Sequence, residues 1–374
     1  MRIFFILILL LIGFSVNYAF ADDDPLNIDS IKDSIPSIWL EAFNENIEVM
    51  GENRTEFEKA FSSLDSKEKK RAAVFLVAYM PLVDLVAMDA QTMIDNIDYA
   101  FKAREEFPWA GEYDETIFFH YVLPHRVSQE PIENFRPFFY NELKDRLKGL
   151  TTLDEAAVEV NKWCDEKVDF KQTQRRDQGP FETLKSGYGR CEEMMIFYID
   201  AARSVGIPAR QAWTPYWAHC DNNHAWSEVW ARGKWNFLGA CEYAPSLDQA
   251  WFVNPAKRAA LVMSVPFGLP DKETTVEEIY RYADYLPDRY AIINSTSFYT
   301  VPGSLEVTVV DKNDEPMKEA NVLVYVFNFG ALRPIAKLVT DENGVAQITI
   351  GEGRFFVSGG DENSGGGMIV NVKK

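Results

Sequence analysis

The stretch that decides the fold is GYGRCEEMMIFYIDAARSVGIPARQAWTPYW, residues 187–217, followed by CDNNHAWSEVWARGKWNFLGACE, residues 220–242. Apolar residues recur at helical spacing after Cys191, which predicts a helix that runs to about Val205, where Gly206-Ile207-Pro208 ends it. Aromatic and β-branched residues then predict strands over 209–217, 224–231 and 235–240, the last two joined as a hairpin at Arg232-Gly233. The predicted order is therefore a helix followed by antiparallel strands.

Two residues of this stretch suggest chemistry. Cys191 opens the predicted helix, where unpaired backbone N–H groups and the helix dipole favour negative charge, so we expect a lowered thiol pKa. His224 begins a predicted strand and would supply the base that a thiol nucleophile needs. One cysteine and one histidine are weak evidence alone, because free cysteines are among the commonest buried residues.

The surrounding motifs resemble the transglutaminase-like superfamily over roughly residues 151 to 245. In that family a GxC segment opens the nucleophile helix, a GIPAR-like strand follows, HAWxEVW carries the histidine, and a tryptophan-led strand carries an acidic third residue. The resemblance implies an α+β papain-like fold and acyl transfer through a thioester, with Cys191 as nucleophile and His224 as base. Peptide N-glycanases share a similar arrangement. Upstream segments also resemble exported transglutaminase-like proteins of Bacteroidetes-type bacteria: AYMPLVDL (78–85), FFHYVLPHR (118–126) and NKWC (161–164).

The third catalytic position departs from the family pattern. The family aspartate falls four residues after the strand tryptophan, and Trp235 plus four is Gly239. If the two hairpin strands extend far enough, His224 lies opposite Cys241 or Glu242, depending on the size of the turn. We therefore expect Glu242 to orient the imidazole; the alternative is a solvent-facing charge at the end of a strand.

The chain has four cysteines and no CxxC pair: Cys164, Cys191, Cys220 and Cys241. This spacing is not that of a zinc ribbon or a redox dithiol, and we expect neither a metal nor a cofactor. The hairpin brings Cys220 near Cys241, where a disulfide or a thiol pair could form. A zinc site of His219, Cys220, His224 and Cys241 is the alternative, although its spacings match no usual ligand pattern. His219 and Asp221 are otherwise fallback candidates for the catalytic region.

Other side chains near the motifs have open roles. A thiol acyltransferase needs one oxyanion donor besides the Cys191 N–H, and the preceding loop offers Gln172, Gln174, Gln178 and Tyr188. Aromatic residues alternate along the predicted strands, and we expect most to be core and some to line a substrate groove: Trp213, Tyr216, Trp217, Trp226 and Trp230.

The flanking segments predict further domains. Residues 22–150 have helical periodicity, and we interpret their histidines, His120 and His125, as packed or surface residues. The core is expected at 151–268 and a helical connector, around Val276 to Tyr285, at 269–302. Residues 303–374 alternate in the strand period, which predicts a small β-sandwich of the carboxypeptidase-regulatory or prealbumin-like kind.

The N-terminus and the charge indicate where the protein works. Residues 1–21 combine Arg2, an apolar run and an Ala19-Phe20-Ala21 ending, which predicts a signal peptide cleaved before Asp22. The alternative is an uncleaved membrane anchor, because residues 3–20 are just long enough to span a bilayer. We therefore expect an extracytoplasmic protein, periplasmic, cell-surface or secreted, without membrane insertion after cleavage. The net charge of −19 opposes binding to nucleic acid.

The sequence thus favours an exported cysteine hydrolase or acyltransferase that acts on an amide bond of a protein, peptide or glycopeptide substrate. Cys191, His224 and Glu242 are its expected catalytic residues. The alternative is a catalytically idle binding or surface-assembly protein that keeps the fold, as the glycine at position 239 suggests.

Overall fold

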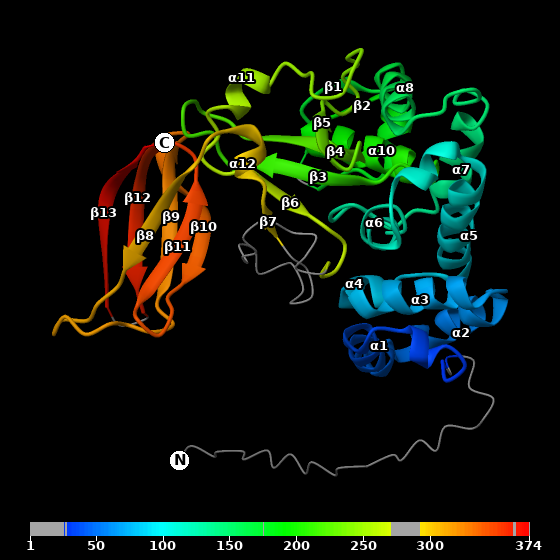
Figure 1. Ribbon diagram of the computed structural model, residues 1–374, viewed down its shortest axis with the longest axis horizontal. Coiled ribbons are helices and arrows are strands. Elements are labelled where there is room, and N and C mark those ends of the chain that lie inside the picture. The colour runs from blue at the N-terminus through cyan, green and yellow to red at the C-terminus, as the bar shows by residue number, and fades with distance from the viewer. Residues whose placement is uncertain (1–25, 27, 175, 271–291, 362–363, 374) are drawn as a thin grey trace, which may run out of the picture.

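The computed structural model describes residues 26, 28–174, 176–270, 292–361 and 364–373 (Figure 1). The predicted signal peptide and the helix predicted around Val276 to Tyr285 lie outside these ranges. Within the ranges, none of the helices is both long and apolar enough to cross a lipid bilayer.

The N-terminal segment is helical, as its periodicity predicts. Several of its helices begin at side-chain caps: Asp89 Oδ1 accepts from Thr92 N at 2.9 Å, and Asp114 Oδ1 accepts from Ile117 N at 2.9 Å. Pro81 follows the end of one helix, in keeping with its inability to continue it. The helices are α1 (Ser37–Val49), α2 (Arg54–Ser63), α3 (Lys67–Tyr79), α4 (Leu82–Leu85), α5 (Ala90–Glu106), α6 (Glu115–Tyr121) and α7 (Arg136–Leu143), with 3-10 turns η1 (Lys32–Ser34), η2 (Gly51–Asn53) and η3 (Pro108–Glu112).

The central region combines helices with a five-stranded sheet. Its elements are α8 (Leu153–Asp165), β1 (Asp169–Phe170), α9 (Pro180–Ser186), β2 (Tyr188–Gly189), α10 (Cys191–Ser204), β3 (Ala209–Thr214), β4 (His224–Ala231), β5 (Lys234–Leu238), α11 (Val253–Ala256), β6 (Met263–Val265), β7 (Ile293–Asn294) and α12 (Thr296–Tyr299). The sheet has the order β5-β4-β3-β6-β7 and is antiparallel throughout, and α10 packs against β4 and β3. This is the predicted α+β core.

The ends of the decisive elements follow from local chemistry. Arg190 N donates to Glu193 Oε2 at 2.9 Å and so begins α10, while Gly206, at φ +74°, ends it. Arg232 and Gly233 have φ values of +58° and +71°, the signature of a two-residue hairpin turn, which confirms the predicted β4–β5 hairpin. The strand predicted over 209–217 is shorter than expected, because β3 ends at Thr214, directly before a proline.

The helical segment and the central sheet share one hydrophobic core. The same cluster contains Phe75 and Phe118 from the helices and Phe197 and Val229 from α10 and β4. The helical segment also supplies donors to the carbonyls at the end of α10: Trp109 Nε1 to Val205 O at 2.9 Å, Tyr113 Oη to Gly206 O at 2.9 Å, and Arg136 Nη1 to Arg203 O at 2.8 Å. Since a helix leaves its last carbonyls without intrahelical partners, these bonds fix α10 to the N-terminal helices.

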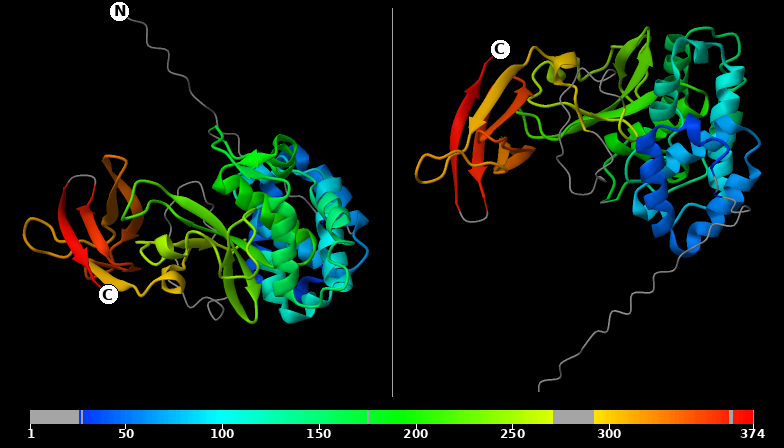
Figure 2. Two further views of the ribbon diagram at one scale, coloured as in Figure 1. Left: turned by 90° about the horizontal axis from the view of Figure 1, so that it is seen from above. Right: turned by 60° about the horizontal axis from the view of Figure 1, so that its bottom comes forward.

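The C-terminal region is all strand, as predicted. It has one sheet with the order β10-β9-β12-β13 and a second with β11-β8, and a common hydrophobic cluster fills the space between them. The strands are β8 (Gly303–Thr308), β9 (Asn321–Asn328), β10 (Ala331–Val339), β11 (Val345–Ile350), β12 (Gly353–Gly360) and β13 (Gly365–Val372). Figure 2 shows these sheets at one end of the molecule and the helices at the other, with the five-stranded sheet between them.

Candidate active site

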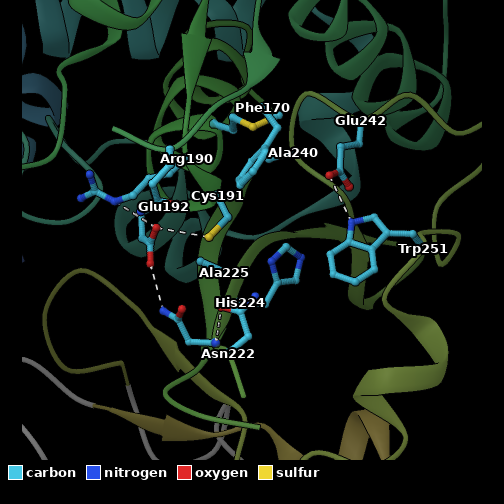
Figure 3. A pocket seen from close by; sticks show the side chains of 13 residues that line it. Phe170, Arg190, Cys191, Glu192, Asn222, His224, Ala225, Ala240, Glu242 and Trp251 are labelled. Carbon is cyan, nitrogen blue, oxygen red and sulfur yellow. Dashed lines mark hydrogen bonds and ion pairs between the residues drawn. The ribbon is translucent and has the colours of Figure 1, made fainter. Parts of the chain in front are cut away.

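One cavity of about 580 Å³ brings together the three predicted catalytic residues. Cys191, His224 and Glu242 all line it, from the start of α10, the start of β4 and the turn after β5 (Figure 3). The remaining lining residues are Phe170, Gln172, Arg190, Glu192, Met194, Asn222, Asn223, Ala225, Ala240 and Trp251. Segments distant in sequence therefore converge on the predicted nucleophile.

Cys191 is the first residue of α10, but its thiol is held in the neutral form. Its Sγ donates to Glu192 Oε2 at 3.2 Å. Burial raises the pKa of Cys191 to about 12, and the negative charge of Glu192 adds to the rise. The backbone N–H of Ala225, next to His224, opposes this shift less strongly. The predicted lowering of the thiol pKa is wrong, because burial and one carboxylate outweigh the helix N-terminus.

His224 is the first residue of β4 and lies among aromatic rings. Its ring centroid is 4.8 Å from that of Trp251 and 5.0 Å from that of Phe252. Burial lowers the pKa of His224 to about 4, so the imidazole is neutral at physiological pH. Its Nε2 atom is buried without a hydrogen-bond partner. A neutral imidazole has the protonation state that a general base requires.

Glu242 reaches the cavity by a route different from the predicted one. The β4–β5 pairing ends at Ser227 and Leu238, so no ladder places Glu242 opposite His224. The chain instead turns, with Glu242 N donating to Gly239 O at 3.1 Å and Cys241 at φ +53°. The turn directs the carboxylate into the cavity, where Oε1 accepts from Trp251 Nε1 at 3.1 Å.

The space beside Gly239 is already occupied by this carboxylate. A Cβ built on Gly239 would meet Glu242 Oε2 closer than real Cβ atoms come to any neighbour, and would lie 3.1 Å from Glu242 Cβ. Burial raises the pKa of Glu242, and its Oε2 atom has no hydrogen-bond partner. Residue 242 thus places a carboxylate where a side chain at position 239 would otherwise project.

The three residues share a cavity without being bonded to one another. Within the described ranges, no hydrogen bond or ion pair joins the side chains of Cys191, His224 and Glu242. His224 Nε2 and Glu242 Oε2 are both buried polar atoms that lack a partner. Such atoms are costly to leave unpaired, so a hydrogen bond between them, direct or through water, would relieve both.

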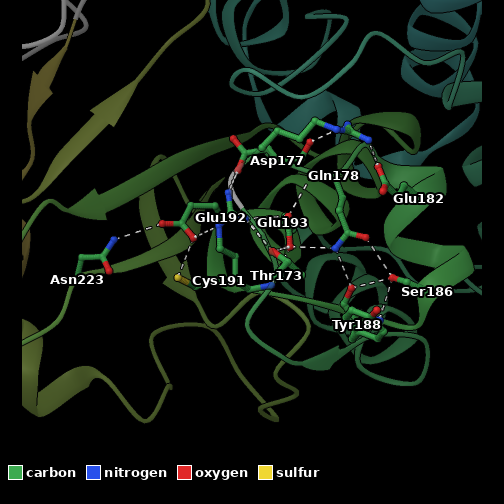
Figure 4. Close-up of polar contacts among 12 residues, drawn as sticks. Thr173, Asp177, Gln178, Glu182, Ser186, Tyr188, Cys191, Glu192, Glu193 and Asn223 are labelled. Atoms are coloured by element: carbon green, nitrogen blue, oxygen red, sulfur yellow. Dashed lines mark hydrogen bonds and ion pairs between the residues drawn. The ribbon is translucent and has the colours of Figure 1, made fainter.

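Arg190 and Glu192 line the cavity and make polar contacts at its edge, and Figure 4 shows those of Glu192 with Cys191 and Asn223. The Arg190 guanidinium contacts the carboxylates of Asp177, Glu192 and Glu193, the last two at 3.2 and 3.1 Å. Glu192 Oε1 also accepts from Asn223 Nδ2 at 3.3 Å, across from α10 to the loop that precedes β4. Glu192 thus contacts both Cys191 at the start of α10 and the loop that leads into β4. The sequence analysis did not single it out, although it directly follows Cys191.

The structure separates the cysteines that the hairpin prediction brought together. All four cysteines lie in the described ranges and are free thiols. Cys241 is buried beside Cys164, whereas Cys220 is exposed on the loop before β4. Asp221 is engaged elsewhere, as the acceptor of Phe329 N, and His219 lines a different cavity. The part of the chain that the structure describes contains no group of three or more His, Cys, Asp or Glu side chains that could hold a metal ion.

The cavity favours one of the four oxyanion candidates. Gln172 lines it. Gln178 is committed to Glu193 and to the Tyr188 carbonyl, at 3.0 and 3.2 Å, and neither Gln174 nor Tyr188 is among the lining residues. Gln172 and the N–H groups of the first turn of α10 are therefore the available donors.

The aromatic residues divide between core and site. Trp217 and Trp226 are buried, in agreement with the core interpretation, and Trp213 lines a second cavity that shares Arg190, Glu192 and Ala225 with the first. Trp251, which the sequence analysis missed, is 61% exposed and contacts both His224 and Glu242. Trp251 belongs to no recognised motif, because it lies in the loop that follows β5.

The histidines of the helical segment are structural, as interpreted from the sequence. His120 Nδ1 lies 2.6 Å from Phe267 O, and His125 Nε2 lies 2.7 Å from Asp84 Oδ2. Both side chains are buried.

Comparisons with known proteins found a family model and solved structures that match parts of this chain. Residues 141–240 match the family model of the transglutaminase-like superfamily. A solved structure of a candidate cysteine protease from Cytophaga hutchinsonii is 13% identical, with 51% of this chain and 68% of that one covered, at a TM-score of 0.29. Red sea bream transglutaminase is 10% identical, with 74% of this chain and 59% of that one covered, also at 0.29. No curated protein matches the sequence. By the family-model match, residues 141–240 form a transglutaminase-like core.

Proposed function

We propose that this transglutaminase-like core is a cysteine-dependent hydrolase or acyltransferase that acts on amide bonds of proteins, peptides or glycopeptides. The observation that carries the proposal is the single cavity lined by Cys191, His224 and Glu242. The superfamily match over residues 141–240 supports the thiol chemistry at a coarser level.

The reaction that these residues would perform begins from a neutral thiol and a neutral imidazole. His224 takes the thiol proton as Cys191 Sγ attacks the carbonyl carbon, and backbone N–H groups of α10 together with Gln172 stabilise the oxyanion. His224 then gives the proton to the leaving amine, which leaves a thioester on Cys191. Water or an amine attacks the thioester next. Glu242 would orient the imidazole through Nε2 and stabilise its charged form during the transfer.

The test compares cysteine variants on a panel of amide substrates. Wild-type protein is incubated with glutamine-containing peptides and glycopeptides, with and without an added primary amine, and the products are identified by mass spectrometry. Cys191→Ala should abolish turnover, whereas Cys220→Ala, which removes an exposed thiol away from the cavity, should retain it. Turnover that survives in Cys191→Ala would exclude the proposal.

A binding protein with an idle site is the second candidate. It is favoured by the high pKa of Cys191 and by the missing hydrogen bond between Cys191 and His224 in the described residues. Trapping of a thioester on Cys191 by hydroxylamine during incubation with a substrate would show that the protein is an enzyme and would exclude the idle site.

Export remains a proposal that rests on residues 1–21. Protein isolated from fractionated cells should begin at Asp22 and be found outside the cytoplasm. A cytoplasmic protein that begins at Met1 would contradict it.

A further inference from the structure

The loop of residues 215–223 connects the two central strands and ends at His224. Thr214 pairs with His224 at its base, and Asn222 and Asn223 line the cavity of Cys191. Most hairpin loops have about two to five residues, so a loop of this length needs contacts outside the hairpin to hold one shape. Asn223 is the last loop residue and directly precedes His224, which the β3–β4 ladder also holds through its pairing with Thr214.

The C-terminal sheet provides these contacts through one side chain. Asn328, at the end of β9, is fully buried. Its Nδ2 donates to three loop carbonyls, those of Trp217 at 2.8 Å, Cys220 at 2.8 Å and Asn222 at 3.3 Å. One amide group therefore joins the beginning, middle and end of the loop.

Two further bonds close the same arrangement. Trp217 N donates to Asn222 O at 2.9 Å inside the loop, and Phe329 N, next to Asn328, donates to Asp221 Oδ1 at 2.7 Å. Asn328 and Trp217 are both buried, and a buried polar group is costly to leave without a partner, so loss of the Asn328 amide would destabilise this loop conformation.

The contacts continue from the loop to the nucleophile. Asn223 Nδ2 donates to Glu192 Oε1, and Glu192 Oε2 accepts from Cys191 Sγ. His224 follows Asn223 directly. Asn328 of the C-terminal sheet thus bonds to Asn222, two residues before His224. The next residue, Asn223, bonds to the Glu192 carboxylate that accepts from the Cys191 thiol.

We propose that Asn328 is a positioning residue, through which the C-terminal β-sandwich holds the 215–223 loop so that His224 and Asn223 face Cys191. The inference rests on the proposed function in that it gives His224 a catalytic role. It assigns the β-sandwich to the active site instead of to a separate task.

A matched pair of variants tests the proposal on the full chain. Asn328→Ala removes the loop contacts. Thr340→Ala weakens the same sheet at the opposite end of the β9–β10 hairpin, where Thr340 Oγ1 accepts from Ala320 N at 2.9 Å. Asp221→Ala removes the exposed acceptor of Phe329 N and serves if Asn328→Ala does not fold. Thermal unfolding, amide hydrogen exchange of residues 215–224 and the rate of Cys191 alkylation by iodoacetamide are measured for each.

Asn328→Ala should raise exchange in the loop by about tenfold, which is the effect of losing one net hydrogen bond, and should speed alkylation of Cys191. Asp221→Ala should change both in the same direction by less. Thr340→Ala should lower the unfolding temperature with loop exchange and alkylation unchanged. Equal effects of Asn328→Ala and Thr340→Ala, or none in the loop, would overturn the proposal. These readouts need no turnover, so the proposal and the proposed function fail in different experiments.

Discussion

The carboxylate of Glu242 occupies the space into which a Cβ atom on Gly239 would project. The resemblance to the superfamily predicts an aspartate at position 239, and this chain has a glycine there. The turn from Gly239 to Glu242 delivers a carboxylate to the same place from three residues further along. The chain thus has a carboxylate beside position 239, although residue 239 itself is a glycine.

This relationship predicts a reciprocal exchange of residues. Glu242→Ala should lower kcat/KM by roughly a hundredfold, the scale of a lost acid–base contribution. Gly239→Asp alone should push the Glu242 carboxylate out of its present position, because the new Cβ would meet it. The double variant Gly239→Asp with Glu242→Ala should recover activity above Glu242→Ala. A double variant no more active than Glu242→Ala would contradict the exchange.

Glu192 should restrain the nucleophile. Its Oε2 atom accepts a hydrogen bond from Cys191 Sγ at 3.2 Å, and its negative charge raises the pKa of Cys191, second to burial. Glu192→Gln should therefore speed alkylation of Cys191 at pH 8 by roughly tenfold, because removal of one adjacent charge lowers an acid's pKa by about a unit. Peptide mass spectrometry measures the rate. Glu182→Gln, which removes a charge paired with Arg176 on the surface, is the control and should leave it unchanged.

The buried imidazole should make stability depend on pH. Burial lowers the pKa of His224 from 6.5 to about 4, so the unfolded chain binds this proton more tightly than the folded one. The contribution of neutral His224 to the free energy of unfolding is present in full above pH 6.5. It falls by about 3 kcal/mol as the pH drops toward 4. Urea unfolding of wild type and His224→Ala at pH 7.5 and 4.5 measures it. His224→Ala should lose less stability than wild type on acidification. Equal losses would show that a group other than His224 causes the pH dependence.

Glu228, in the HAWSEVW motif, should be structural. It accepts from Arg210 Nε at 2.6 Å and from Ser264 Oγ at 3.0 Å, and both charged side chains are buried. Glu228→Ala leaves the guanidinium without its carboxylate and should lower the free energy of unfolding by about 3–5 kcal/mol. Chemical denaturation checks this value. Glu166→Ala, which breaks a surface pair with Arg146, should cost under about 1 kcal/mol.

The sequence predicted those parts of the molecule that local pattern controls. Helix α10, the hairpin turn at Arg232-Gly233 and the strand-rich C-terminal region all follow from periodicity and turn residues near one another in the chain. Cys191 and His224 were identified through motifs of the same local kind, and the structure places both on one cavity.

Other features depend on contacts that no local pattern records. The thiol pKa was predicted in the wrong direction because burial of Cys191 depends on how β4 and its loop pack over α10. Trp251 and Asn328 contact the site region from far along the chain. The route of Glu242 was wrong because the β5 ladder stops at Leu238, whereas the prediction extended it.

The bonds from Trp109, Tyr113 and Arg136 to the end of α10 limit where the chain can be cut into fragments for expression. A recombinant fragment limited to residues 141–240 would leave three carbonyl oxygens at the end of α10 without these donors and would expose the apolar surface of α10 that packs against the N-terminal helices. Such a fragment should be insoluble, and chimaeras joined near residue 150 should inherit the same defect. The N-terminal helices and the central sheet should therefore be expressed together as one folding unit, and be exchanged together in any chimaera.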